Sequence, residues 1–412
     1  MTTRTPQNTH CVDMTTGSRA MSDAPVYEID LAAFWADPYP DLKRMRAEAP
    51  IAYVPQLGAT LITRRDEIFA QEKRIEIFSS DQPQGLMTVL MGQNMMRKDG
   101  DAHMAERKAI FPTVSPKTVK QVWVAQFRAA AQRVLDDLAP RGACDLVRDY
   151  AMPVSAEALK AITGLTNMTA AEMDRVSQGM IDGCANYAGD PLVEARCHDC
   201  TASIDAHIDA MIPVLDARPD HSLLSVQRRA GLSDAQTRAN IKLAISGGQN
   251  EPRDAIAGTA WAVLSHPDAL ARLQSGAVPW LRAFEEYARW ISPIGMSPRR
   301  VAQRATVQGV TLEPEDRVFL MFGSGNRDES VFANPDRFDL DQDIAPAISF
   351  GAGPHFCAGA WASRALIGEV ALPLLFERLP GLALDGEARF GGWAFRGPIT
   401  VPVRWEPAPR EG

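Results

Sequence analysis

The sequence predicts a mainly helical α+β fold in which small β-sheets lie toward both ends of the chain. Between Asp101 and Arg272, most segments repeat their apolar residues at helical spacing. Short stretches near the two ends instead combine strand-forming residues with turn residues. The chain has 412 residues, 46% of them hydrophobic, so it can bury a large core. Length alone would allow two or three domains, but no internal repeat or low-complexity linker marks a boundary.

The N-terminal residues are polar and rich in threonine, and they lack the apolar core of a signal peptide. We therefore expect residues 1–25 to form a disordered tail, with Met14 and Met21 as alternative starts. The next segments are expected to be a short helix and two strands, over Asp37–Ala49, Ile51–Val54 and Ala59–Thr63, with Gly58 joining the strands.

The middle of the chain is expected to be helical, with breaks at Pro112, Pro153, Gly164, Pro191 and Pro219. The clearest helices are expected from about Ala102, over Ile241–Leu264 and over Trp361–Leu379. Strands are expected over Val301–Val318, with turns at Gly309 and Pro314-Glu315, and over Gly392–Trp405.

Charge and cysteine content exclude several classes of protein. The net charge of −8 and the pI near 5.5 argue against nucleic-acid binding, which needs clustered cations. No run approaches the roughly 18 apolar residues that cross a bilayer, so we expect no membrane insertion. Six scattered cysteines suit a reducing cytoplasm, where we expect the protein to reside. Cys197-His198-Asp199-Cys200 has no second ligand pair at zinc spacing, so we expect a plain helix there.

One cysteine lies in a glycine-rich turn, Phe350-Gly351-Ala352-Gly353-Pro354-His355-Phe356-Cys357-Ala358-Gly359. A thiolate is the metal-binding form of cysteine, and N–H groups at the start of a following helix favour negative charge on sulfur. Glycines let the backbone approach a large flat ligand. The pattern Phe-x-x-Gly-x-His-x-Cys-x-Gly resembles the haem-ligand loop of cytochromes P450. The resemblance implies that Cys357 binds the iron of haem b, with Phe350, Gly351 and Gly359 packed beside it.

This resemblance extends over nearly all of the chain after residue 25 and implies one P450 haem domain over residues 26–412. Glu286-Tyr287-Ala288-Arg289 and the later Pro335-Asp336-Arg337-Phe338 resemble the family's Glu-x-x-Arg helix and the arginine that completes its buried charge triad. The implied role of Glu286, Arg289 and Arg337 is structural. Without that context, an acid and a base three residues apart are common decoration of a helix surface.

Haem propionates need cations, and four positions match those of the family. His103 and Arg107 lie four residues apart on an expected helix whose segment 101–108 resembles the propionate-binding helix. Arg300 and His355 match two further propionate positions. One departure is Ala347, where the family often has a histidine.

The expected distal helix contains Ser246-Gly247-Gly248-Gln249-Asn250-Glu251-Pro252-Arg253-Asp254. Most P450s have an acid–alcohol pair here that relays protons to the dioxygen being activated. The spacing from Gly248 to His266-Pro267 places Asn250 at the acid and Glu251 at the alcohol. Pro252 lacks an N–H and is expected to kink the helix, which would free the carbonyl of Gly248. Glu251 would then move protons, unless it is an ordinary solvent-facing carboxylate.

A Glu-Pro pair in this helix resembles bacterial P450s that O-demethylate lignin-derived methoxyaromatics such as guaiacol. The implied reaction yields a phenol and formaldehyde in the catabolism of aromatic compounds. By family position, the pocket walls include Leu86, Leu90, Ile245, Gly248, Ile294, Met296, Trp393 and Phe395. Leu90 and Cys184 fall where guaiacol demethylases have aromatic residues, which leaves guaiacol itself uncertain.

The chain has no flavin motif and no iron–sulfur cysteine set. Electrons are therefore expected from NAD(P)H through a separate ferredoxin-type or flavin/iron–sulfur reductase. A basic patch is expected to receive that partner, formed by Arg107, Lys108, Lys117, Lys120 and Arg364. Three alternatives stay open: a hydroxylase of a terpene or fatty acid, a peroxide-driven peroxygenase, and a non-catalytic haem-binding sensor. Product formation with peroxide alone, compared with NADH plus redox proteins, separates them.

Overall fold

The computed structural model describes residues 22–186 and 189–407. Residues 1–21 of the expected tail lie outside the described residues. The last four residues of that tail are ordered, which corrects the expectation. The N–H of Asp23 donates to the carbonyl of Thr311 (3.2 Å), and the carbonyl of Pro25 accepts from the N–H of Tyr53 (2.9 Å).

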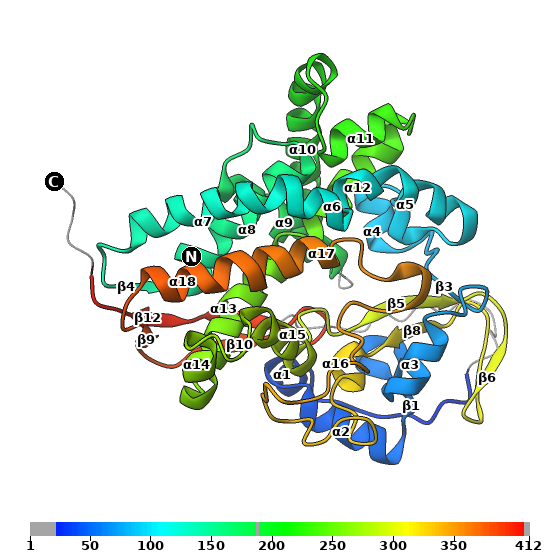
Figure 1. Ribbon diagram of the computed structural model, residues 1–412. Helices are drawn as coiled ribbons and strands as arrows, with labels where there is room; N and C mark the ends of the chain where they lie inside the picture. Colours follow the sequence, from blue (N-terminus) through cyan, green and yellow to red (C-terminus); the bar gives the residue numbers. More distant parts are fainter. Residues whose placement is uncertain (1–21, 187–188, 408–412) are drawn as a thin grey trace.

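Helices make up most of the described chain (Figure 1). In chain order, the α-helices are α1 (Leu31–Ala36), α2 (Tyr39–Glu48), α3 (Arg65–Gln71), α4 (Leu86–Met91), α5 (Gly100–Val114), α6 (Pro116–Thr118), α7 (Val124–Leu138), α8 (Met152–Thr163), α9 (Ala170–Cys184), α10 (Pro191–Ala217), α11 (Leu223–Arg229), α12 (Asp234–Ser246), α13 (Asn250–Leu264), α14 (Pro267–Gln274), α15 (Trp280–Ile291), α16 (Phe322–Gly325), α17 (Ala360–Ser363) and α18 (Leu372–Arg378). Short 3₁₀ and π segments join them, at η1 (Pro55–Leu57), η2 (Met95–Arg97), η3 (Val119–Trp123), η4 (Val147–Ala151), η5 (Gly353–His355) and η6 (Arg364–Ala371).

The strands of the described residues form four small sheets. The largest has the order β1-β2-β8-β5-β3 and lies beside α2, α3 and α16 in the lower right of Figure 1. The strands are β1 (Ile51–Val54), β2 (Ala59–Ile62), β3 (Phe78–Ser79), β4 (Ala143–Asp145), β5 (Ser297–Val301), β6 (Ala305–Val307), β7 (Val310–Leu312), β8 (Arg317–Leu320), β9 (Ala383–Leu384), β10 (Arg389–Gly391), β11 (Gly397–Thr400) and β12 (Pro402–Arg404). In the five-stranded sheet only β2 and β8 are parallel. This architecture confirms the predicted mainly helical α+β class.

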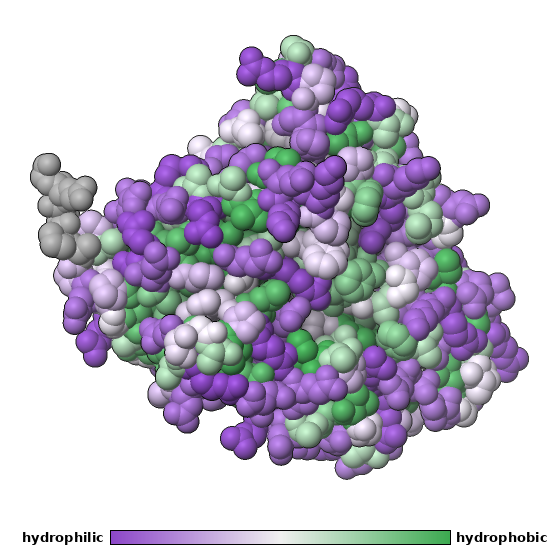
Figure 2. All heavy atoms as spheres, viewed as in Figure 1, coloured by the Kyte–Doolittle hydropathy of each residue, from purple (hydrophilic) through white to green (hydrophobic). Residues whose placement is uncertain are grey.

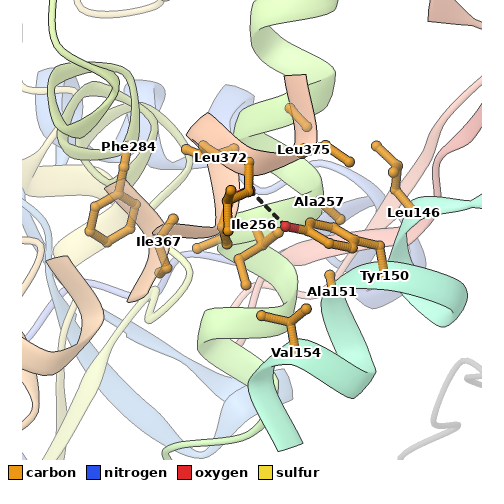
Figure 3. Packing of buried hydrophobic residues seen from close by; sticks show 14 of the residues in the cluster. Leu146, Tyr150, Ala151, Val154, Ile256, Ala257, Phe284, Ile367, Leu372 and Leu375 are labelled. Carbon is orange, nitrogen blue, oxygen red and sulfur yellow. Dashed lines mark hydrogen bonds between the residues drawn. The ribbon is translucent and has the colours of Figure 1, made fainter. Parts of the chain in front are cut away.

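The largest apolar core lies where α13, at the centre of the molecule, packs against η4, α8, α15 and η6, with α7 packed on α8 and η6. Figure 3 shows Tyr150 of η4 reaching into this core among Ile256, Ala257 and Leu375. The Tyr150 hydroxyl donates to the carbonyl of Ala371 (2.7 Å), and burial raises the pKa of Tyr150. The hydrogen bond satisfies the one polar group that this aromatic side chain brings into the core.

Several element boundaries differ from those expected. Pro112 does not break a helix, because α5 runs on to Val114. The segment expected as one helix over 361–379 is helical throughout but changes to π geometry over Arg364–Ala371. The expected helix over 241–264 is interrupted between Ser246 and Asn250. This interruption lies near the cysteine loop and bears on function.

The surface in Figure 2 is largely hydrophilic, with smaller hydrophobic patches between the charged residues. Among the described helices, none combines the length and apolar character that crossing a membrane requires.

Candidate functional site: a cysteine loop facing a broken helix

The cysteine loop is a tight turn held by its own backbone. The N–H of Cys357 donates to the carbonyl of Phe350 (2.9 Å), and the N–H of Gly351 donates to the carbonyl of Ile348 (2.9 Å). Gly351 and Gly353 both have positive φ, +71° and +61°, a region that other residues rarely adopt. The turn leads directly into the continuous helical run of α17, η6 and α18.

The loop balances opposing effects on the Cys357 thiol. Burial is the largest cause and raises the pKa of Cys357. The backbone N–H of Gly359 and the guanidinium groups of Arg107 and Arg364 act in the opposite direction. A partly buried thiol with an N–H donor and two cations nearby is suited to hold a metal ion as a thiolate.

A cluster of imidazole and acidic side chains lies beside the loop. The rings of His103 and His355 are 4.1 Å apart between centroids. His355 Nε2 lies 2.9 Å from Asp99 Oδ1, and the Ser79 hydroxyl donates to Asp99 Oδ2 (2.7 Å). Although burial acts to raise it, hydrogen bonds from His355 and Ser79 hold the pKa of Asp99 at about 2. Asp99 thus remains an anion that fixes His355, a role that sequence reasoning did not assign.

Strand β5 places Arg299, rather than Arg300, at this cluster. Side chains alternate across a strand, so two consecutive arginines face opposite sides of the sheet. Arg300 donates to the carbonyl of Asp81 (2.9 Å) and pairs with Glu315. Arg299 is 3% exposed, pairs with Glu72 (2.5 Å) and lies close enough to His355 to lower its pKa, after the larger effect of burial. The prediction that Arg300 joins the cluster is therefore wrong, and the arginine next to it joins instead.

The cluster leaves one buried donor unused. Among the described residues, Arg299 Nε has no hydrogen-bond partner although its other guanidinium nitrogens are bonded. Buried polar groups are rarely left without a partner, so an acceptor supplied by a ligand fits this place. Together with the Cys357 thiol, these side chains match the needs of a haem, which has an iron atom at its centre and two carboxylates at one edge.

Across from the cysteine loop, the long apolar helix of the sequence is interrupted. Helix α12 ends at Ser246, and α13 begins at Asn250. Hydroxyl groups from neighbouring helices hold the broken ends: Ser177 donates to the carbonyl of Ile245 (3.0 Å) and Ser155 to the carbonyl of Gln249 (2.8 Å). A side chain at Gly248 would collide with the carbonyl of Ala244. The break is therefore a fixed feature of the packing.

The sequence predicted a kink at Pro252, but the helix is not kinked there. Pro252 is the third residue of α13 and so lies in the first turn, where backbone N–H groups have no partner within the helix. Proline is tolerated in this turn because its missing donor costs nothing there. The interruption comes earlier, at residues 247–249, and Pro252 marks the start of the new helix.

Glu251 belongs to the first turn of α13 and lies near enough to Cys357 for its charge to act on the thiol. It is only half-buried, and after burial its charge is one of the causes that raise the pKa of Cys357. Its neighbour Asn250 is 3% exposed, and Asn250 Oδ1 has no hydrogen-bond partner among the described residues. A buried amide and a carboxylate whose charge reaches the thiol thus follow directly after the break.

A buried ionic network follows directly after this pair, and sequence reasoning missed it. Arg253 is 7% exposed and pairs with Asp254 (2.9 Å) and with Asp174 of α9 (3.0 Å). Gln249 Nε2 also donates to Asp174 Oδ1 (3.2 Å). The network ties the end of the break and the first turns of α13 to α9. Its partner Asp174 is 75 or more residues away in the sequence, so no local motif indicates the pairing.

The residues expected to line a pocket divide between separate clusters. Leu90 and Ile245 belong to the core of α4, α9, α10 and α12, with Leu86 and Cys184 at its border. Trp393 packs against Phe34 and Phe319 with ring centroids 5.7 and 5.8 Å away, in a cluster that also borders Met296. Ile294 and Phe395 form an isolated β-bridge. The packing therefore brings together Leu86, Leu90 and Ile245. The Trp393 ring lies in a different cluster, against Phe319 of strand β8.

The expected charge triad is only partly present. Glu286 and Arg289 form a fully buried ion pair (2.7 Å), and Arg289 also donates to the carbonyls of Asn326, Pro335 and Arg337. The side chain of Arg337 is exposed, so the prediction that it completes the buried triad is wrong. Its carbonyl, rather than its guanidinium, reaches the pair. Arg327 is the buried arginine here; it lies 3.5 Å from the Tyr39 ring centroid and donates to the carbonyl of Trp290 (2.7 Å).

Comparison with known protein families gives a match to the cytochrome P450 model over residues 278–365, which includes Cys357. The chain is 26% identical to the cytochrome P450 monooxygenase PikC of Streptomyces venezuelae, covering 92% of this chain and 94% of PikC. It is 29% identical to a methyl-branched lipid omega-hydroxylase of Mycobacterium tuberculosis, covering 93% and 96%. It is 25% identical to CYP199A2 of Rhodopseudomonas palustris, covering 96% and 98%.

Solved structures show the same fold. The chain superimposes on P450BioI in complex with an acyl carrier protein with a TM-score of 0.83, at 22% identity over 91% of this chain and all of that one. It also superimposes on CYP109E1 of Bacillus megaterium bound to testosterone, with a TM-score of 0.81 at 20% identity over 90% and 98% of the two chains. With the cysteine loop, the histidine–arginine cluster and the full-length relatives in agreement, the chain belongs to the cytochrome P450 superfamily and is a haem-thiolate oxidoreductase of the monooxygenase type.

Proposed function

We propose that this enzyme O-demethylates a small methoxyaromatic compound of the guaiacol type. The observation that carries the proposal is Glu251-Pro252 at the start of α13, where the Glu251 charge is near enough to Cys357 to add to the effect of burial in raising the pKa of that thiol. The pair resembles that of the aromatic O-demethylating P450s. The relatives reported above share the family, and their names do not include this substrate class.

Cys357 would hold the iron, and His103, Arg107, Arg299 and His355 would bind the propionates. Arg299 takes the place first assigned to Arg300, because its buried Nε–H has no other acceptor among the described residues. When bound, the haem supplies dioxygen activation at a thiolate-ligated iron. Phe350, Gly351 and Gly359 shape the turn around the sulfur.

Glu251 performs the acid–base work on the distal side. Its carboxyl oxygens are buried, and the group would take up and release protons near the reacting atoms, a task that needs a titratable group within their reach. Asn250 replaces the usual acid and offers an amide oxygen and two N–H donors at the same break. Gly248 keeps side-chain atoms away from this space, and Pro252 holds the first turn of α13.

The balanced reaction takes the methyl ether, dioxygen, two electrons and two protons to a phenol, formaldehyde and water. A hydroxyl replaces one hydrogen of the methoxy carbon, and the hemiacetal that forms breaks its C–O bond to release formaldehyde. The chain contributes orientation of the ether and delivery of both protons. Leu86, Leu90 and Ile245 supply apolar walls for an aromatic ring.

A second candidate is hydroxylation of an alkyl chain. Two relatives are named for such reactions, the methyl-branched lipid omega-hydroxylase and a steroid C26-monooxygenase of Mycolicibacterium smegmatis that is 26% identical. The helical cluster has Leu90 in its core and Cys184 at its border, rather than aromatic residues at these positions. This composition suits a flexible aliphatic substrate as well as a ring.

Electrons come from a separate protein, as in related P450s, and the partner is of the ferredoxin or flavin/iron–sulfur type. Exposed Lys108, Lys117 and Lys120 lie on α5, α6 and η3, close to α17 and the cysteine loop in Figure 1. Exposed Met104, Phe111 and Trp361 on α5 and α17 add apolar area to this charged face. An acidic partner with an apolar centre fits such a face.

The test is a ferric-haem absorbance titration with methoxyphenols, methoxybenzoates, terpenes and fatty acids. A substrate that displaces the iron-bound water shifts the iron to high spin. We expect a full shift with guaiacol-like ethers, followed by equimolar formaldehyde and phenol with NADH and redox proteins. A shift with terpenes or fatty acids alone would reject O-demethylation and favour alkyl hydroxylation. Turnover with peroxide but not with reduced partner would favour a peroxygenase instead.

A further inference from the structure

Glu72 is a buried acid inside the cationic cluster, directly after helix α3. It is 2% exposed and is one of the least accessible carboxylates among the described residues. Glu72 Oε1 pairs with Arg299 Nη2 (2.5 Å), while Oε2 accepts from the N–H of Ala352 in the cysteine loop (3.3 Å). One carboxylate therefore links the loop that carries Cys357 to the strand that carries Arg299.

The cysteine loop is shaped to fit against this acid. A Cβ atom at Gly351 would lie 3.3 Å from Glu72 Oε2, and one at Gly353 would lie 3.0 Å from the Glu72 carbonyl oxygen. Both glycines also have positive φ, so another residue would be strained there whatever the space. The backbone of the loop thus approaches Glu72 more closely than side chains would allow.

Glu72 also determines which part of Arg299 is available. Two guanidinium nitrogens are bonded, Nη2 to Glu72 and Nη1 to Ser297 Oγ (2.5 Å) and the Pro298 carbonyl (2.9 Å). Only Nε lacks a partner among the described residues. The acid therefore neutralises Arg299 and orients the remaining donor. Burial raises the pKa of Glu72, and both Arg299 and the Ala352 N–H oppose this effect.

We propose that Glu72 is a positioning residue of the haem site, which fastens the cysteine loop to Arg299 and whose negative charge lowers the reduction potential of the haem iron. A buried anion disfavours the arrival of an electron nearby, because charges interact strongly where water is excluded. Removing one partner of a buried ion pair also leaves the other uncompensated. The inference rests on the haem site and not on the identity of the substrate.

The test compares Glu72→Gln with Asp66→Asn. Gln keeps the shape and the acceptor for Ala352 but removes the charge. Asp66 lies in the neighbouring helix α3 with 78% of its side chain exposed. Asp66→Asn therefore removes an equal charge from a position in contact with solvent. The measurements are the ferric/ferrous midpoint potential of substrate-free protein at mildly alkaline pH, and the rate of haem transfer to apomyoglobin.

We expect a more positive potential and faster haem transfer in Glu72→Gln, with both values unchanged in Asp66→Asn. The carbon monoxide spectrum of the reduced protein shows that the thiolate ligand is retained. An unchanged potential in Glu72→Gln with that spectrum intact would overturn the proposal, as would an equal shift in Asp66→Asn. If Glu72→Gln does not fold, Glu72→Asp keeps the charge and shortens the tether; we then expect faster haem transfer at an unchanged potential.

A shifted potential in Glu72→Asp would show that the tether alone sets it, and would overturn the electrostatic role. The experiment uses no substrate. Failure of the O-demethylation proposal therefore appears in the formaldehyde assay, whereas failure of this inference appears in the potential.

Discussion

At the scale of single residues, the functional side chains of this protein are anions placed where their charge is costly. Glu251 and Glu72 both act on the cysteine loop, Glu251 from the first turn of α13 and Glu72 from the residue directly after α3. Asp99 is the third, and its partners rather than solvent keep it ionised. Removing any of these carboxylates would change the electrostatic environment of a neighbour: Cys357 for Glu251, Arg299 for Glu72 and His355 for Asp99.

Glu251 is expected to control how efficiently electrons are used for product. In Glu251→Ala the haem should bind normally, but the yield of product per NAD(P)H oxidised should fall by an order of magnitude or more, because positioned acid–base groups contribute roughly 10²–10⁴-fold. Oxygen consumption, peroxide release and product are measured together. Glu251→Asp is the control that keeps the carboxyl group and should recover part of the yield. Full coupling in Glu251→Ala would remove Glu251 from the mechanism.

Asp99 is expected to stabilise the fold at all but very acidic pH. Its pKa falls from an ordinary value of 3.8 to about 2 in the folded protein. A lowered pKa stabilises the fold above pH 3.8, and this contribution is lost as the pH falls from 3.8 to about 2. The difference corresponds to roughly 2 kcal/mol. Urea unfolding of Asp99→Asn should therefore show a deficit at pH 6 that shrinks toward pH 3. A deficit that is independent of pH would contradict the ionic explanation.

At the scale of elements, local sequence signals located most helices and strands but misplaced the features that depend on packing. Gly58 joins β1 and β2 with φ +57°, as the turn residues indicated. Pro252 led us to expect a kink in the distal helix, but the structure has a break at residues 247–249 instead, where Ser177 and Ser155 from other helices donate to the carbonyls of Ile245 and Gln249. Those partners come from about 70 to 95 residues away. No window of local sequence contains them.

The pair of helices α9 and α10 offers a test of such packing. A Cβ atom at Gly179 would collide with Cys200 Sγ, while Cys200 Cβ would lie at an ordinary 3.4 Å. Gly179→Ala is therefore expected to lower the free energy of unfolding by about 1–3 kcal/mol, the usual cost of overpacking. The double variant with Cys200→Ala should regain most of this loss, because the colliding sulfur is gone. Additive losses in the double-mutant cycle, measured by urea unfolding, would show that the two residues do not meet.

At the scale of the whole molecule, the haem motif gave the fold and the cofactor, whereas long-range partners decided the details. Cys357 and the Glu286–Arg289 pair lie in short motifs that resemble those of the family, so the sequence was enough to locate them. The choice of Arg299 over Arg300 depends on which face of β5 turns inward, and two adjacent arginines give no sign of that in the sequence. The prediction for Arg337 was wrong because its side chain is exposed, and only its backbone carbonyl accepts a hydrogen bond from Arg289. Glu72 and the Arg253 network were missed because their partners are distant in the chain.

The charged face around α5, α6 and η3 leads us to predict how surface charge affects the rate at which the protein accepts electrons. Reversing Lys117 and Lys120 to glutamate should slow haem reduction by an acidic ferredoxin about tenfold at low salt, because charge steering sets the association rate. The difference should shrink as salt is added, since screening shortens the range of the interaction. Lys43→Glu is the matched control. Lys43 is also exposed but lies on α2, at the opposite end of the molecule in Figure 1. Stopped-flow reduction under carbon monoxide measures all three rates, and equal rates for the double reversal and wild type would place the electron donor on another face.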